Sequence, residues 1–325
     1  MAGIKQENAF GSGNYLGLDV NTSSYNRQLV LSTTNPYFTA DGVSRTFDLY
    51  YKTSSPYSEQ GGDYELRTTG GSVRFGVPFT EQDTVFFGLG AERTRIVEGT
   101  DIPQAYQEHI AEFGETSTSV PLTVGWTRDD RDSALVPSKG RLQRFNTEWG
   151  VAGDTRYLKS SYQFQQYIPI NKQYTFAFNA ELGMGKGLNG RKYPVFKNFY
   201  GGGLGSVRGF EQGTLGATSP IVNSTSTTQQ VNIGGNRNLV LNAEVSTPFP
   251  GAGNDRTLRM FGFVDVGNVW APDQSMSASD LRASMGIGLS WISPIGPLRF
   301  AWANPVRKQE GDKIQKFQFQ IGTSF

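Results

Sequence analysis

The last ten residues of the chain, K-F-Q-F-Q-I-G-T-S-F (316–325), alternate between apolar and polar side chains. Phe317, Phe319, Ile321 and Phe325 fall on one face of an extended backbone, and the residues between them fall on the other. A period of two is typical of a β-strand with one apolar and one polar face. The same period runs through nearly the whole chain, and we find no convincing amphipathic helix.

Fifteen segments show this alternation and are predicted to be strands. Many of them reach ten residues or more. Strands of globular proteins usually have about 5–6 residues, whereas a tilted strand needs roughly 9–11 residues to cross a bilayer. The predicted strands lie near 3–9, 14–23, 26–35, 43–52, 68–78, 84–97, 118–127, 141–151, 157–168, 173–185, 238–247, 258–269, 281–292, 297–304 and 314–325.

The polar face of these strands carries Glu, Asp, Arg, Gln and Gly, which suits a water-filled lumen better than a packed core. Mean hydropathy is −0.42, a value compatible with a membrane barrel because its strands alternate between the two faces. We therefore predict an all-β fold, a transmembrane antiparallel up-and-down β-barrel that forms one domain over residues 1–325. A soluble β-sandwich or propeller is the alternative.

Composition argues against several other classes of protein. Only 18% of residues are charged and the net charge is +1, so the chain lacks the basic excess of a nucleic-acid-binding protein. It has no cysteine, which removes disulfides, thiol catalysis and cysteine zinc sites. Its single histidine, His109, lies in the predicted polar loop 98–117 and is expected to be solvated. We predict no catalytic residues, no metal site and no cofactor.

The connections between predicted strands alternate in length, and this orients the barrel. Short connections such as 10–13 and 79–83 alternate with longer polar loops such as 98–117, and the longest loop is 186–237. Outer-membrane barrels place short turns in the periplasm and longer loops outside. The loop 186–237 is therefore expected on the extracellular side, and the C-terminal Phe325 on the periplasmic side.

The long loop sets one arginine in a glycine-rich run, G-G-G-L-G-S-V-R-G-F (201–210). Glycine-rich runs are often flexible connectors, but a tight turn that presents Arg208 to a fixed partner is the competing interpretation. In the strands that follow the loop, alternation places Glu244 and Asp265 on the polar, inward face.

At these residues the chain resembles the outer-membrane protein insertase superfamily. V-R-G-F (207–210), preceded by N-F-Y-G-G-G (198–203), is similar to the signature of the large sixth extracellular loop in that family. T-N-P-Y-F-T-A-D-G-V-S (34–44), F-V-D-V-G-N-V-W (263–270) and W-I-S-P-I-G-P-L (291–298) agree with the family in the same order. The resemblance covers essentially all 325 residues.

The resemblance implies a sixteen-stranded barrel whose long loop folds back into the lumen and is latched there. The implied latch motif is Val207, Arg208, Gly209 and Phe210, and the implied acidic partners of Arg208 are Glu244 and Asp265. Phe210 is expected to pack against the wall, while Gly205 and Gly209 are expected to allow close backbone approach and a positive φ. Arginine suits such a site because its guanidinium makes a fixed bidentate contact.

The resemblance also implies a function in the bacterial outer membrane. Members of the family fold and insert unfolded outer-membrane β-barrel proteins through a weak lateral seam between the first and last strands. The incoming strand would pair with an exposed edge by β-augmentation. The implied partners are these substrates, the lipid bilayer and accessory outer-membrane lipoproteins, the last mainly through periplasmic domains. No nucleic-acid partner is expected.

The chain departs from the family pattern at its beginning. Ten predicted strands precede the loop 186–237, where the family has eleven. We therefore expect the first strand of the family, its periplasmic POTRA domains and a signal peptide to be absent. Segments 3–9 and 314–325 would then meet as parallel neighbours, which is unfavourable in an antiparallel barrel. We predict a poorly closed seam, to which the last strand contributes Phe317, Phe319, Ile321, a potential kink at Gly322, and Phe325.

Two alternatives to an insertase stay open. A two-partner-secretion or autotransporter-assembly transporter of the same superfamily would share V-R-G-F (207–210). An outer-membrane protein of another class, either a passive porin or an enzyme, would need other features. A porin would be expected to carry a constriction loop with clustered charge, and an enzyme a set of Ser, His and acidic residues on inward positions. The single histidine argues against the enzyme.

Overall fold

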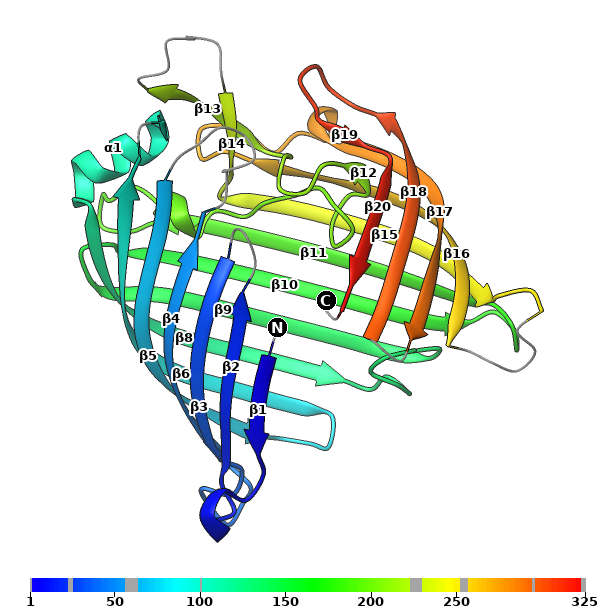
Figure 1. Cartoon of the computed structure of the whole chain (residues 1–325), viewed down its shortest axis with the longest axis horizontal. Helices are drawn as coiled ribbons and strands as arrows, with labels where there is room; N and C mark the ends of the chain where they lie inside the picture. Colours follow the sequence, from blue (N-terminus) through cyan, green and yellow to red (C-terminus); the bar gives the residue numbers. More distant parts are fainter. Residues whose placement is uncertain are drawn as a thin grey trace.

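Fifteen strands form one antiparallel sheet in which each strand pairs with the next one along the wall. The computed structural model describes residues 2–22, 26–55, 64–99, 101–222, 230–251, 257–293 and 296–322. Figure 1 shows the sheet curved around a central space. In wall order the strands are β1 (Ala2–Gln6), β2 (Tyr15–Thr22), β3 (Asn26–Asn35), β4 (Ser44–Ser54), β5 (Tyr64–Pro78), β6 (Asp83–Glu98), β8 (Thr116–Asp129), β9 (Gly140–Gly153), β10 (Tyr157–Pro169), β11 (Thr175–Gly187), β15 (Arg237–Pro248), β16 (Leu258–Trp270), β17 (Arg282–Ser293), β18 (Gly296–Arg307) and β20 (Phe317–Ile321). The predicted all-β fold and the fifteen strands are confirmed.

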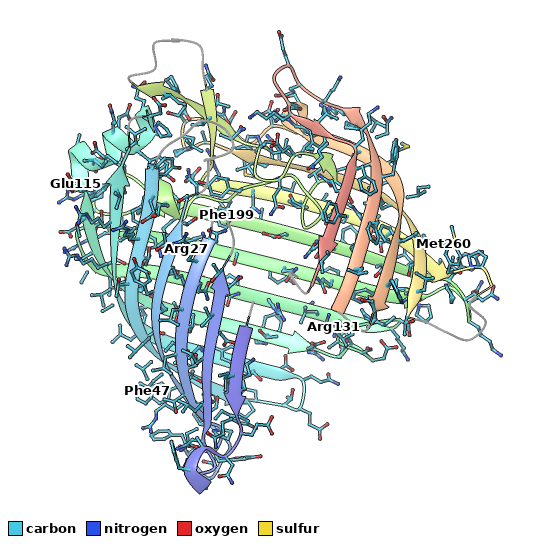
Figure 2. All side chains as sticks on the ribbon, viewed as in Figure 1. Arg27, Phe47, Glu115, Arg131, Phe199 and Met260 are labelled. Atoms are coloured by element: carbon cyan, nitrogen blue, oxygen red, sulfur yellow. The ribbon has the colours of Figure 1, made fainter. Side chains whose placement is uncertain are left out.

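The wall is apolar outside and polar inside. Phe47 on β4 and Met260 on β16 lie on the outer surface, where they are 46% and 37% exposed (Figure 2). The inner surface carries charged side chains such as Glu92 on β6 and Asp265 on β16, which pair with Lys197 and Arg208 of the connection between β11 and β15. This arrangement inverts that of a soluble sandwich and suits a wall between lipid and a polar lumen.

The two ends of the sheet are not joined to each other. Among the described residues, β1 pairs only with β2, and β20 pairs only with β18. Figure 1 shows β1 and β20 at the two margins of the sheet, with a gap between their ribbons. No ladder connects the described residues of the two strands, in agreement with the predicted poorly closed seam. The edge backbone groups of both strands therefore lack a neighbour within the sheet.

The C-terminal segment is more divided than predicted. The sequence predicts one strand over 314–325, but the structure has two, β19 (Ile314–Gln315) and β20. β19 leaves the wall and pairs with β12 (Gly209–Phe210), because the long loop offers it backbone partners inside the lumen. Gly322 follows β20 with a φ of 96°, in the region that favours glycine. Phe325 lies outside the described residues.

The long connections gather at one end of the wall, the upper end in Figure 1. There, helix α1 (Gln104–Phe113) lies with the short strands β7 (Ile102–Pro103), β13 (Ala217–Val222) and β14 (Gln230–Gly234), and we call these four elements the cap. The prediction that the chain lacks an amphipathic helix is wrong. Tyr106, His109, Ile110 and Phe113 recur at helical spacing, and this short pattern carried the signal. Among the described residues, no helix is both long and apolar enough to cross a membrane.

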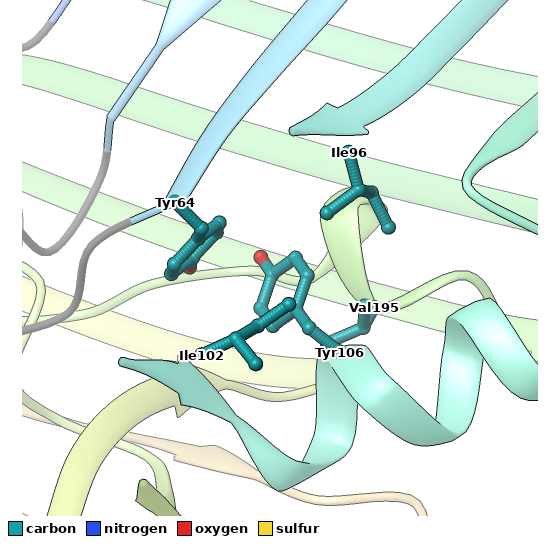
Figure 3. Packing of buried hydrophobic residues seen from close by; sticks show 5 residues of the cluster. All are labelled: Tyr64, Ile96, Ile102, Tyr106 and Val195. Carbon is teal, nitrogen blue, oxygen red and sulfur yellow. The ribbon is translucent and has the colours of Figure 1, made fainter. Parts of the chain in front are cut away.

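A small apolar core ties the cap to the wall. Figure 3 shows that Tyr106 of α1 packs among residues from four other parts of the chain. The aromatic rings of Tyr64 and Tyr106 lie 4.4 Å apart between centroids, in tilted geometry. Because members of the cluster come from β5, β6, the cap and the loop before β15, the cluster joins these segments. Its buried members are Tyr64, Ile96, Ile102, Tyr106 and Val195.

His109 is buried rather than solvated, so the expectation for this residue is also wrong. It is 5% exposed on the inner face of α1, and its Nε2 lies 3.3 Å from the hydroxyl of Ser117. Its ring contacts those of Phe113 and Phe196, with centroids 4.6 and 5.1 Å away. Burial lowers the pKa of His109 from its ordinary value of 6.5 to about 4. The imidazole is therefore neutral in the folded cap at pH 7.

The cap is expected to loosen on acidification because of His109. An unfolded cap binds a proton at His109 below pH 6.5, whereas the folded cap resists protonation until about pH 4. The stability of the folded cap that is present above pH 6.5 is therefore lost as the pH falls through this window. Each pH unit in the window weakens the cap by about tenfold in its opening equilibrium. Hydrogen exchange of the α1 amides, corrected for the intrinsic pH dependence, measures this opening.

The matched variant is His109→Gln, which keeps a polar side chain that does not titrate. Its α1 exchange is expected to lose the His109 component of the pH dependence. Equal pH dependence in the variant and the parent would contradict the assignment.

Candidate functional site: the lumen loop and the last strand

The part of the connection between β11 and β15 that lies outside the cap, residues 188–216 and 235–236, turns back into the space enclosed by the wall (Figure 1). We call it the lumen loop. Its two arms are held together where Phe199 bridges Gly235 and where Gly201 bridges Leu215. A 3₁₀ turn, η3 (Val195–Lys197), lies on the first arm. Beyond the second bridge, residues 202–214 make a tip that carries V-R-G-F.

Glycines shape the tip, although not all of those predicted. Gly209 has a φ of 90°, and an added Cβ would lie 3.0 Å from the Cβ of Ala303 on β18. Gly202 has a φ of 95°, and an added Cβ would lie 2.4 Å from the carbonyl oxygen of Glu211. The expectation for Gly205 is wrong, since it has no positive φ and no atom within 4 Å of its Cβ position. The turn is made by the glycines before it.

Arg208 is buried against the wall by two acidic side chains. Its Nε and Nη2 donate to the two carboxylate oxygens of Asp265, each at 2.7 Å, and its Nη1 donates to Glu244 at 2.9 Å. The backbone N–H of Arg208 donates to Asp265 as well, at 3.0 Å. The side chain of Arg208 is 3% exposed and that of Asp265 is 0% exposed. The structure thus brings together the three charged residues singled out in the sequence.

Two residues not singled out in the sequence complete this cluster. Arg299 on β18 donates to Glu244 at 2.6 Å, so two arginines face two carboxylates and the group is neutral. Asn242 on β15 donates to Asp265 at 2.8 Å, which occupies a further acceptor position of the carboxylate. Both residues stand on inward positions of predicted strands, and that alternation was the available signal. Pairing of opposite charges offsets much of the cost of burying them.

Aromatic rings enclose the two guanidinium groups. The Arg208 guanidinium carbon lies 3.5 Å from the ring centroid of Phe263, and that of Arg299 lies 4.6 Å from Phe261. Phe261 and Phe263 are inward residues of β16 and are almost fully buried. The cation–π contacts add attraction and exclude water from the ion pairs.

The rest of the V-R-G-F motif packs against the wall and the last strand. Val207 and Phe210 are 0% exposed and cluster with Leu215 and with Val240 of β15. Gln318, the single buried described residue of β20, donates to the carbonyl oxygen of Phe210 at 2.7 Å. The lumen loop therefore contacts the last strand as well as β15 and β16.

The apolar residues of the last strand point the other way. Phe317, Phe319 and Ile321 are 52%, 61% and 63% exposed on the outer surface. The structure does not bring them near Arg208, because alternation directs Gln318 inward and its neighbours outward. They form an apolar outer edge at the seam.

A wall of this kind, apolar outside and polar inside with an arginine-bearing loop held in its lumen, defines an outer-membrane β-barrel with an internal plug. The chain belongs to the Omp85 superfamily, whose domain matches residues 8–325. It is a protein of the bacterial outer membrane, as its relatives indicate.

The relatives include two proteins named outer membrane protein assembly factor BamA. The BamA of Neisseria meningitidis is 37% identical over 360 residues, which cover 100% of this chain and 45% of that protein. The BamA of Nitratidesulfovibrio vulgaris is 28% identical, over 99% of this chain and 39% of that protein. The chain thus spans less than half the length of these two relatives.

Solved structures agree with the fold. BamA from Haemophilus ducreyi lacking POTRA domains 1–3 matches with a TM-score of 0.89 at 27% identity, over 98% of this chain and 65% of that chain. CdiB from Acinetobacter baumannii matches with a TM-score of 0.57 at 14% identity, over 98% of this chain and 54% of that chain, which shows a shared fold alone.

Arg208→Ala is expected to destabilise the barrel by about 3–5 kcal/mol, because it leaves Asp265 buried without its cation. The stability of Arg208→Lys should lie between those of Arg208→Ala and the parent, because lysine keeps the charge but cannot make the bidentate contact. Denaturant unfolding of the barrel in detergent, followed by heat-modifiable migration, measures both.

The matched control is Arg95→Ala, which removes an arginine from an ion pair with Glu115 whose side chains are 56% and 57% exposed. An exposed pair of this kind is worth about 0–1 kcal/mol. Equal unfolding midpoints for the Arg208 and Arg95 variants would show that the buried cluster does not stabilise the barrel.

Proposed function

We propose that this barrel folds and inserts β-barrel proteins into the bacterial outer membrane through its lateral seam. The observation that carries the proposal is the pair of facing edges on β1 and β20, neither of which has a second strand partner among the described residues. An unpaired edge is a template for another strand. The two BamA relatives, named as assembly factors, support this use of the edge.

The last strand is weakly held within the wall. β20 pairs with β18 through five residue pairs, from Leu298 with Ile321 to Trp302 with Phe317. By contrast, β17 and β18 pair along eleven positions. A short ladder costs less to separate, so a precursor strand can compete for the edge by β-augmentation.

The proposed action needs no covalent chemistry, so we propose that the protein is not an enzyme. Backbone hydrogen bonds of the new strand replace water or edge contacts, and burial of its apolar face in lipid supplies the driving force. The proposed substrates are unfolded outer-membrane β-barrel proteins. Accessory outer-membrane lipoproteins are proposed as partners, mainly through periplasmic domains such as those of longer family members.

A photoreactive residue placed at Ile4 on β1 or at Phe319 on β20 is expected to cross-link to a barrel substrate during its insertion. Ile4 and Phe319 are 74% and 61% exposed and stand on the two edge strands. The matched control is Leu49 on β4, which is 62% exposed but pairs with neighbours on both sides. Cross-linking as strong at Leu49 as at the edges would contradict insertion at the seam.

Depletion of the protein in cells separates this proposal from a secretion transporter of the same superfamily. An insertase is expected to cause the loss of many unrelated barrels from the outer membrane, measured by quantitative proteomics of that membrane. Loss of one exported protein with normal levels of other barrels would favour the transporter.

A further inference from the structure

A second charged contact of the lumen loop lies away from Arg208. Lys197, at the end of η3, places its Nζ 2.7 Å from Glu92 on β6 and 2.7 Å from Glu148 on β9. The side chains of Lys197, Glu92 and Glu148 are 16%, 10% and 29% exposed. One lysine thus bridges two inward carboxylates from two wall strands, and the group carries a net charge of −1.

The backbone of Lys197 is held as well as its side chain. Its carbonyl oxygen accepts hydrogen bonds from Lys159 Nζ on β10 and from the hydroxyl of Tyr193, each at 2.8 Å. The carboxylates are supported in turn, since Glu92 accepts from the Ser119 hydroxyl at 3.1 Å and Glu148 from Tyr157. This contact is a built site and not a chance approach of surface charges.

The two contacts hold the lumen loop to different parts of the wall. Lys197 binds β6 and β9, the sixth and eighth strands in wall order, whereas Arg208 binds β15 and β16, the eleventh and twelfth. The loop therefore crosses the lumen and is fixed on both sides. Lys197 adds a charged contact to the apolar packing of Val195, which also holds the first arm of the loop beside β5 and β6.

A cavity of about 590 Å³ lies between this arm and the wall. Wall residues from β4 to β9, including Tyr50, Arg74 and Thr123, line one side. Phe196, Lys197 and Tyr200 of the lumen loop line the other. Lys197 and its two carboxylate partners, Glu92 and Glu148, all line this space.

We propose that Lys197, through Glu92 and Glu148, is a second anchor that seals the lumen against ions on the β4–β9 side. The seal depends on one cation that neutralises one carboxylate and holds the other by charge-assisted hydrogen bonds. Lys52 and Arg74 line the same space as Glu92 and Glu148, so removal of the Lys197 ammonium makes the lining more negative by one charge and shifts its selectivity toward cations relative to the parent. This inference does not depend on the insertion activity.

Conductance of the folded barrel in planar lipid bilayers tests the seal. Lys197→Gln is expected to raise the fraction of time spent in conducting states by at least about tenfold, since it breaks a largely buried charge pair. In a salt gradient, the reversal potential of the variant is expected to shift toward the equilibrium potential of the cation. The shift in selectivity is a readout that a merely structural role of Lys197 would not move.

Lys192→Gln is the matched control, in the same loop. The ammonium of Lys192 pairs with Glu108 at 3.5 Å, with side chains 66% and 52% exposed, so its loss should leave conductance and selectivity unchanged. A folded, heat-modifiable Lys197→Gln barrel with the conductance and selectivity of the parent would overturn the proposal.

A second variant addresses a failure of Lys197→Gln to fold. The triple variant Glu92→Gln, Glu148→Gln and Lys197→Gln removes the ionic anchor without leaving the two carboxylates unpaired. It is expected to conduct more than the parent and to show no cation selectivity. Conductance at the level of the parent in the triple variant would likewise overturn the proposal.

Discussion

In the hydrocarbon interior of a membrane, a backbone N–H or C=O has no water to bond with, so a spanning wall is stable only where its strands are paired. The other features of this molecule follow from that constraint. Among the described residues, thirteen of the fifteen strands in the sheet have a partner on each side, and β1 and β20 have a partner on one side. Apolar side chains cover the outside, which leaves the polar ones to fill the lumen. The same constraint that stabilises the wall leaves unpaired backbone groups along its two margins.

The lumen loop supplies partners for the charged side chains that point into the barrel. Inward carboxylates such as Asp265 and Glu92 would be costly if they were left without partners, and the loop supplies a cation to each of them. Arginine serves where two carboxylate oxygens must be bound in one plane, and lysine where a point charge lies between two acids. The loop is therefore part of the internal structure of the barrel, and its path is determined by the charges of the wall.

Much of this architecture could be predicted from the sequence, because the alternation of apolar and polar residues along a strand can be read without knowing which segments pack together. The strands, the inward direction of Glu244 and Asp265, and the weak seam all follow from alternation and counting. What failed depends on contacts between distant segments. His109 is buried by Phe196 and Ser117, which no local pattern reveals. The last strand divides because β12 pairs with its first residues. The ion pairs of Lys197 could not be predicted, because nothing near this residue in the sequence points to Glu92 or Glu148 as partners.

The short ladders at the margins also have a mechanical meaning. Among the described residues, β1 pairs with β2 at five positions and β20 pairs with β18 at five, whereas β2 and β3 pair at eight and the other ladders of the wall are longer still. A strand peeled sideways from a sheet breaks its bonds one after another, so the total work scales with the length of the ladder. Lateral tension in the membrane would therefore part the wall first beside the seam, while the long ladders of the opposite side keep their shape. The barrel can therefore widen at the seam while the rest of the wall keeps its curvature.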